Sequence, residues 1–110
     1  MSKRRDPFDA VAHPIRRGIL SLLSEQTDVS AGEIATHFPQ VSRVAVSKHL
    51  GVLRSAGLVR SRARGREVHY TLDPRPLAEM YETWLRRFEP LWEQSLRNLK
   101  RVAEEDPGRS

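Results

Sequence analysis

Residues 42–66 constrain the fold more than any other part of the sequence. Apolar residues recur there at steps of four and three, which predicts a helix with one buried stripe made of Val46, Leu50 and Leu53. Gly57 is expected to end this helix in a left-handed conformation. Apolar and polar residues then alternate on both sides of Arg64-Gly65-Arg66, which predicts a two-stranded hairpin with its turn at that point.

Positive charge is concentrated in the same region. Residues 41–72 contain seven Lys and Arg residues and a single acid, Glu67, whereas residues 1–40 contain five of each sign. Residues 73–110 contain seven basic and eight acidic residues, so most of the net charge of +5 lies on one module. Such a concentration is typical of a surface that binds a polyanion. The alternative is that these arginines only solvate a small domain.

Helix starts are marked by a residue that can cap a helix followed by proline, at Asp6-Pro7, His13-Pro14 and Asp73-Pro74. The first predicted helix is short and has an apolar face of Phe8, Val11 and Ala12. The second is expected to bury Ile15, Ile19, Leu22 and Leu23, with Arg16 and Arg17 pointing outward. Ser30 and Glu33 form a capping-box pattern, so a third helix is expected to begin near Ser30 and to bury Ile34, Ala35 and Phe38.

The length of 110 residues fits one domain. We expect a basic, flexible start at 1–5, a domain over 6–105 and a disordered tail at 106–110. Within the domain, we expect two helices joined by a turn over about 30–56, a hairpin over about 58–72 and a long terminal helix over about 74–105. Pro90 predicts a kink or short break in that helix near Arg87–Glu89.

The predicted helix after Ser42 has a free face once its apolar stripe is buried. A helix of this kind can enter the major groove of double-stranded DNA. Arg43 is the best candidate for bidentate contact with a guanine, and Val44 for contact with a thymine methyl group. Ser42, Ser47 and Lys48 are candidates for either base or phosphate contact.

Further candidate DNA contacts lie outside this face. Arg62, Arg64 and Arg66 are at or next to the hairpin tip, where they would hold phosphates or enter a narrow minor groove. The alternative for these three is an edge strand protected from aggregation by charge. Arg54 is a weaker candidate, and His49 is interpreted as a half-buried packing residue that can also hydrogen-bond a phosphate.

Three segments resemble the ArsR-type winged helix-turn-helix transcriptional regulators. They are the stretch from Asp6 to Arg17, the helix Val46-Ser47-Lys48-His49-Leu50-Gly51-Val52-Leu53, and Ala56-Gly57-Leu58-Val59. The resemblance implies a mainly α fold with a small β-hairpin, the wing. It also implies a homodimer built from the N- and C-terminal helices, which represses transcription at an operator and is released by a signal. An inverted-repeat operator follows from a two-fold dimer.

The chain departs from the metal-sensing members of that family. It has no cysteine, and no histidine occurs after His69. The carboxylates of the terminal helix alone are poor ligands for zinc-type sites. We therefore expect neither a metal nor a cofactor, as in the cysteine-free branch of the family, whose signals are mostly not metals.

The terminal helix has more apolar surface than so small a domain can cover, which predicts a second copy as its partner. The residues expected at this interface are Phe8, Val11, Leu77, Met80, Tyr81, Trp84, Leu85, Phe88, Leu91 and Trp92. The alternative is a helix folded back onto its own domain. An unknown small-molecule effector near Trp84 and Trp92 is a further possibility, although plain dimer core is the commoner role of such aromatic residues.

The sequence thus predicts a sequence-specific regulator that binds double-stranded DNA. The alternative is a winged-helix protein-interaction module that has lost DNA binding. An enzyme is not expected, because no nucleophile elbow, phosphate loop or evident acid pair is present. No apolar run approaches the roughly 18–20 residues of a membrane span and no signal-peptide core follows the start, so a cytoplasmic location is expected.

Overall fold

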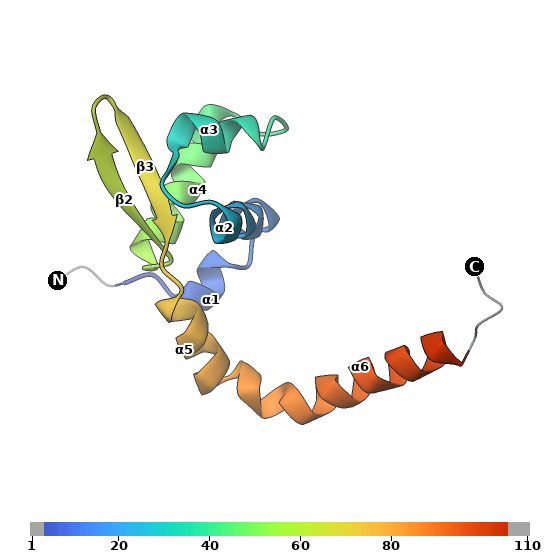
Figure 1. The fold of residues 1–110 in the computed structure, drawn as a ribbon. Helices are drawn as coiled ribbons and strands as arrows, with labels where there is room; N and C mark the ends of the chain where they lie inside the picture. Colours follow the sequence, from blue (N-terminus) through green and yellow to red (C-terminus); the bar gives the residue numbers. More distant parts are fainter. Residues whose placement is uncertain (1–3, 106–110) are drawn as a thin grey trace. The chain divides into compact units, whose positions relative to one another are not determined.

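The computed structural model describes residues 4–105 and shows two compact units, one up to Ala78 and one from Glu79 onward (Figure 1). The tail expected to be disordered at 106–110 lies outside the described residues, as do residues 1–3 of the basic start. The first unit contains α1 (Pro7–Ala10), α2 (Pro14–Glu25), β1 (Val29–Ser30), α3 (Ala31–Thr36), α4 (Arg43–Ser55), β2 (Val59–Arg64) and β3 (Glu67–Leu72). Helix α5 (Arg75–Thr83) begins in the first unit and ends in the second.

Four helices begin where the sequence predicts a start. At each, the side chain of the preceding residue accepts a backbone N–H of the first turn, at 2.9 to 3.1 Å. These capping residues are Asp6, His13, Ser30 and Ser42. Each cap satisfies one of the N–H groups that a helix end leaves without an internal partner.

The predicted hairpin is present as strands β2 and β3, paired from Val59–Leu72 to Arg64–Glu67. Gly65, at the turn, has a φ of 62°, a conformation that glycine adopts without strain. The two-residue strand β1 was not predicted. It pairs with Tyr70 and His69 of β3, so the sheet has the order β1-β3-β2. A strand this short shows no alternating pattern in the sequence.

The core of the first unit lies between helices α2, α3 and α4 and the hairpin, which stands beside them in Figure 1. The stripe predicted for α4 is fully buried, and it packs with Ile19 and Ile34 of the two preceding helices. Gly57 has a φ of 77°, and the N–H groups of Gly57 and Leu58 donate to the carbonyls of Arg54 and Leu53. This is the glycine helix end predicted from the sequence.

Two expectations for the first helices were wrong. Ala12 is exposed and Ala10 is buried instead, because α1 ends at Ala10 and the helical spacing does not continue to Ala12. Arg16 does not point outward, since its Nε donates to the Ala10 carbonyl oxygen at 2.6 Å. The short helix leaves its last carbonyls without helical partners, and the guanidinium supplies donors to them.

The terminal helix is broken, as Pro90 predicts. In the second unit, a 3₁₀ turn over Leu85–Phe88 separates the end of α5 from α6 (Glu89–Glu104). The break begins earlier than expected, at Trp84, whose φ is −142°. Proline cannot donate to the carbonyl four residues before it and clashes with that carbonyl, which explains why residues 85–88 leave the α-helical path.

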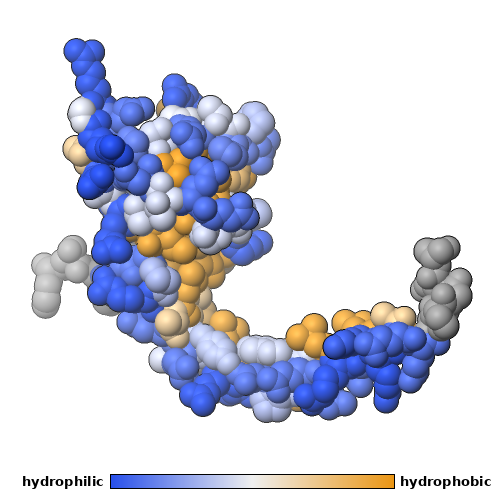
Figure 2. Space-filling view, in the orientation of Figure 1, coloured by the Kyte–Doolittle hydropathy of each residue, from blue (hydrophilic) through white to orange (hydrophobic). Residues whose placement is uncertain are grey.

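The second unit has a small aromatic cluster and a long apolar row. The Tyr81 hydroxyl donates to the Glu89 carboxylate, and the ring centroids of Tyr81 and Trp92 lie 6.4 Å apart. Along α6, apolar residues form one face and hydrophilic residues the other (Figure 2). Four members of the row are between 60% and 69% exposed: Leu91, Leu96, Leu99 and Val102. None of the helices in residues 4–105 has the length and apolar character of a membrane span.

Candidate nucleic-acid interface

Helix α4 presents a polar face that is free along its first two turns. Because Val46, Leu50 and Leu53 are buried, the residues on the opposite side of the helix face solvent. Those predicted to contact DNA on this face are all exposed: Ser42, Arg43, Val44, Ser47 and Lys48. The structure therefore brings this predicted set together on one surface.

The side chains on this face are available for an external partner. Val44 is 66% exposed, which is unusual for a branched apolar residue. Arg43 and Lys48 form no ion pair with any residue between Arg4 and Glu105. Ser42 also caps the helix through its Oγ, which accepts from the Ala45 N–H at 3.0 Å. The face thus combines a free apolar group with two cations that lack an ion pair among the described residues, beside a helix N-terminus.

His49 lies at the edge of this face and connects α4 to the start of the domain. Arg16 Nη1 donates to His49 Nδ1 at 3.2 Å, and the rings of His13 and His49 are 4.4 Å apart. Burial, followed by the nearby His13 and Arg16, lowers the pKa of His49. His49 is half-buried, as expected from its position next to the apolar stripe.

The three arginines near the hairpin tip are in two different situations. Arg62 Nη2 donates to Asp28 Oδ2 at 3.4 Å, and Arg64 donates to the same oxygen. Arg66, in the turn, makes no hydrogen bond or ion pair with any residue from 4 to 105. The prediction from the sequence treated Arg62, Arg64 and Arg66 alike, and it missed Asp28, which is 34 residues before Arg62.

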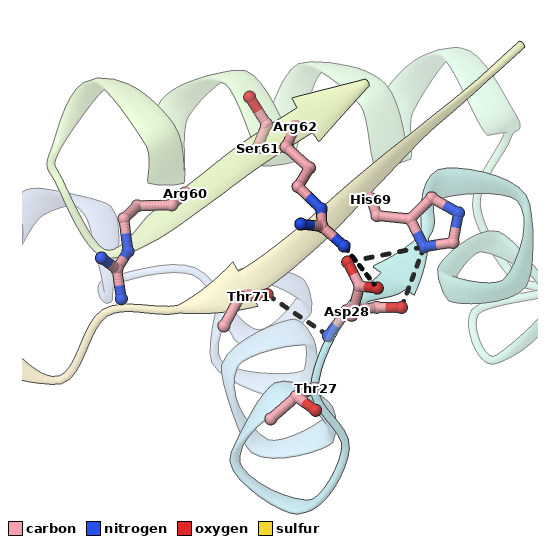
Figure 3. Close-up of a pocket in the computed structure, with 7 residues that line it drawn as sticks. All are labelled: Thr27, Asp28, Arg60, Ser61, Arg62, His69 and Thr71. Atoms are coloured by element: carbon pink, nitrogen blue, oxygen red, sulfur yellow. Dashed lines mark hydrogen bonds and ion pairs between the residues drawn. The ribbon is translucent and has the colours of Figure 1, made fainter. Parts of the chain in front are cut away.

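Asp28 lies over the face of the hairpin that carries Arg62 and His69 (Figure 3). Its backbone N–H donates to Thr71 Oγ1 at 3.3 Å, and its carbonyl accepts from His69 Nδ1 at 2.9 Å. The hydrogen bond to this carbonyl, followed by that to the Glu67 carboxylate, raises the pKa of His69. A hollow of about 530 Å³ lies here, lined by Thr27, Asp28, Arg60, Ser61, Arg62, His69 and Thr71.

Contacts of three further arginines lie along the hairpin and at its base. Arg54, a weaker candidate for DNA contact, donates from Nη1 to Ser61 Oγ at 3.3 Å. At the base of the hairpin, the buried Asp73 accepts from the backbone N–H and the guanidinium of Arg75 and lies 4.0 Å from Arg60 Nε. The hydrogen bonds from Arg75 hold the pKa of Asp73 well below its usual range.

The residues expected at a dimer interface differ in exposure. Val11 and Leu77 pack against the core of the first unit, and Met80 is buried. The most exposed of them are Trp84 and Leu91. The exposed row of α6 continues past the predicted interface residues to Leu96, Leu99 and Val102, which recur at steps of three.

Side chains that bind metals do not converge in the described part of the chain. Within residues 4–105, no group of three or more His, Asp or Glu residues is arranged to hold a metal ion. His37, the C-cap residue of α3, contacts the Glu33 carbonyl oxygen through Nδ1.

A capped helix with one buried stripe, preceded by a shorter helix and followed by an arginine-rich hairpin, defines a winged helix-turn-helix. Residues 11–62 match a family described as a helix-turn-helix domain. The chain is 35% identical to the transcriptional repressor SdpR of Bacillus subtilis, over 74% of this chain and 87% of SdpR. It is 41% identical to the HTH-type transcriptional regulator Rv2034 of Mycobacterium tuberculosis, over 87% of both chains.

A solved structure is similar as well. An ArsR-like transcriptional regulator from Rhodococcus sp. RHA1 superposes with a TM-score of 0.63 at 38% identity, over 87% of this chain and 88% of that protein. The chain belongs to the ArsR family of winged helix-turn-helix transcriptional regulators.

Proposed function

We propose that this protein is a homodimeric repressor that binds an inverted-repeat operator in double-stranded DNA. In each protomer, the free face of α4 enters the major groove and the hairpin lies along the adjacent backbone. The observation that carries the proposal is the set of exposed side chains on α4, where Arg43 and Lys48 have no ion pair within residues 4–105 and Val44 is open to solvent.

Charge supports the same assignment. The α4 face and the hairpin tip both belong to the stretch with an excess of six positive charges. Arg66 at the tip has no internal partner among the described residues, so its guanidinium is available for a phosphate oxygen. The repressing role is proposed from SdpR, which is named a transcriptional repressor.

The exposed row of α6 supports the homodimer. Four large apolar side chains exposed along one helix are an unfavourable surface for an isolated chain in water. A second copy supplies the same row, and two-fold symmetry buries both rows at once. Such a dimer presents two copies of α4, which requires half-sites about one helical turn apart.

The test is selection of bound duplexes from random sequence, followed by anisotropy titration of the selected duplex between 50 and 200 mM salt. With about six phosphates contacted per dimer, affinity is expected to fall by roughly 10³-fold over this range. Footprinting should show two symmetric half-sites. Lys48→Ala should weaken binding, and Lys100→Ala on α6 serves as a control with the same charge change. Failure to enrich any duplex would favour a protein-interaction module instead.

A further inference from the structure

The carboxylate of Asp28 is the only acidic group that contacts the arginines near the hairpin tip within residues 4–105. Arg62 and Arg64 both donate to its Oδ2. Arg62 and Arg64 are two residues apart on β2, so their side chains extend from the same face of the strand. One oxygen that accepts from two guanidiniums is the arrangement that a phosphate oxygen of DNA would take up at the same place.

Two backbone hydrogen bonds hold Asp28 in this position, and its Oδ1 also lies 3.8 Å from His69 Nδ1. The φ of Asp28 is 58°, in the left-handed region that Asp and Asn tolerate better than most residues. Its N–H is bonded to Thr71 and its carbonyl to His69, both on β3 (Figure 3). Removal of the negative charge alone therefore leaves the loop held in place.

The two arginines remain accessible while they are paired. The side chains of Arg62 and Arg64 are 67% and 55% exposed, and that of Asp28 is 27% exposed. An incoming phosphate can therefore reach both guanidiniums but must share them with Asp28. The carboxylate also repels the phosphate directly, because like charges at this distance oppose each other.

We infer that Asp28 is a specificity-determining residue, which competes with DNA phosphates for Arg62 and Arg64 and so restrains sequence-independent binding through the wing. Phosphate contacts position the protein on any duplex, whereas base contacts distinguish sequences. Reduced phosphate attraction at the wing lowers binding to all sequences, which leaves the base contacts of α4 with a larger share of the affinity for the operator. This inference rests on the proposed function.

Asp28→Asn tests it, because asparagine has the same shape, tolerates the same φ and keeps both backbone hydrogen bonds. The matched control is Asp9→Asn, which also neutralises an aspartate paired with an arginine, Arg5 at 3.6 Å, but on α1. Anisotropy is measured with a random-sequence duplex and with a duplex selected by the wild-type protein, at several salt concentrations.

Asp28→Asn should bind the random duplex roughly three- to tenfold more tightly near 100 mM salt. The log–log salt dependence should steepen by about 0.9 for each additional phosphate that the wing neutralises. The ratio of selected to random affinity should fall. In a background of Arg62→Gln with Arg64→Gln, the effect of Asp28→Asn should be much smaller than in the wild-type background, because only the direct repulsion between the carboxylate and a phosphate is then removed.

Equal effects of Asp28→Asn and Asp9→Asn, or weaker binding by Asp28→Asn, would overturn the inference while leaving the proposed function intact. A wild-type protein that binds neither duplex would overturn both. If Asp28→Asn does not fold, Asp28→Gly removes the carboxylate at a φ that glycine adopts freely, and the same outcomes apply to it.

Discussion

Arg16 and His49 are joined by a hydrogen bond of 3.2 Å that links α2 to α4 across 33 positions of sequence. Arginine can only donate, so His49 Nδ1 must be the acceptor and must be unprotonated. Arg16 also donates to the carbonyls of Ala10 and Asp9 at the end of α1. The guanidinium thus connects three helices, and its bond to α4 depends on the neutral form of His49.

The free energy of unfolding should therefore decrease at acidic pH, and part of this decrease should depend on His49. Its pKa is lowered from 6.5 in the folded protein, so the unfolded chain binds more protons between the two pKa values. The free energy of unfolding therefore rises with pH through this window. The stabilisation that depends on neutral His49 is complete above about pH 6.5 and is lost as the pH falls below that value. In urea unfolding between pH 5 and 7.5, the free energy of unfolding should gain less with rising pH in His49→Gln than in the wild type.

The groups facing His49 in this window are His13 and Arg16, which both disfavour its protonation. His69 acts in the opposite direction, because its pKa is raised and its contribution is lost as pH increases. The wild type and His49→Gln both contain His69 and His13, so the difference between their pH dependences reports the contribution of His49. An identical pH dependence for the two proteins would contradict the role assigned to His49.

Two glycines give opposite predictions for the same substitution. Gly57→Ala forces a side chain into a φ of 77° and places its methyl group against the Arg4 guanidinium, so it should lower stability by about 1–2 kcal/mol. Gly51 lies within α4 with nothing within 4 Å of an added Cβ, so Gly51→Ala should raise stability by about 0.5–1 kcal/mol. Urea titration of both variants measures the two effects. Stabilisation by Gly57→Ala would mean that this helix end does not need glycine.

The features predicted correctly from the sequence are those set by neighbouring residues. The stripe of α4, its end at Gly57 and the turn at Gly65 follow from helical spacing and from backbone conformations that favour glycine. The break before α6 follows from the missing donor of Pro90. In each case the cause lies within a few residues of its effect.

The features that were missed depend on contacts between different helices and strands. Asp28 contacts Arg62 only because β1 pairs with β3, and this pairing has no signal in a strand of two residues. Arg16 was expected to point into solvent because helical spacing places it away from the apolar residues of α2. Its guanidinium instead donates to the Ala10 carbonyl oxygen at the end of α1. The exposure of the α4 residues predicted to face a DNA groove could be predicted without such contacts, because it follows from the burial of the opposite side of the same helix.

Substitution of Arg43 and Arg66 should separate base reading from phosphate binding. Arg43→Ala should weaken binding to the selected duplex by about 1–3 kcal/mol and relax the preference at one base pair. Arg66→Ala should weaken binding to all duplexes alike and reduce the salt slope by about 1. The measurement is anisotropy on the selected duplex and on its single-base variants. A uniform loss with Arg43→Ala would assign that residue to phosphate instead.

Introduction of charge into the exposed row of α6 should dissociate the proposed dimer. Leu96→Glu with Leu99→Glu removes two leucines, each of which contributes about 1.5–3 kcal/mol when buried, and places carboxylates in the interface. Association should weaken by at least about a hundredfold, since each 1.4 kcal/mol is a factor of about ten. Light scattering at micromolar concentration should give twice the chain mass for the wild type and one chain mass for the variant. Gln94→Glu, on the polar face of the same helix, should remain dimeric, and a monomeric wild type that still bound its operator would disprove the dimer.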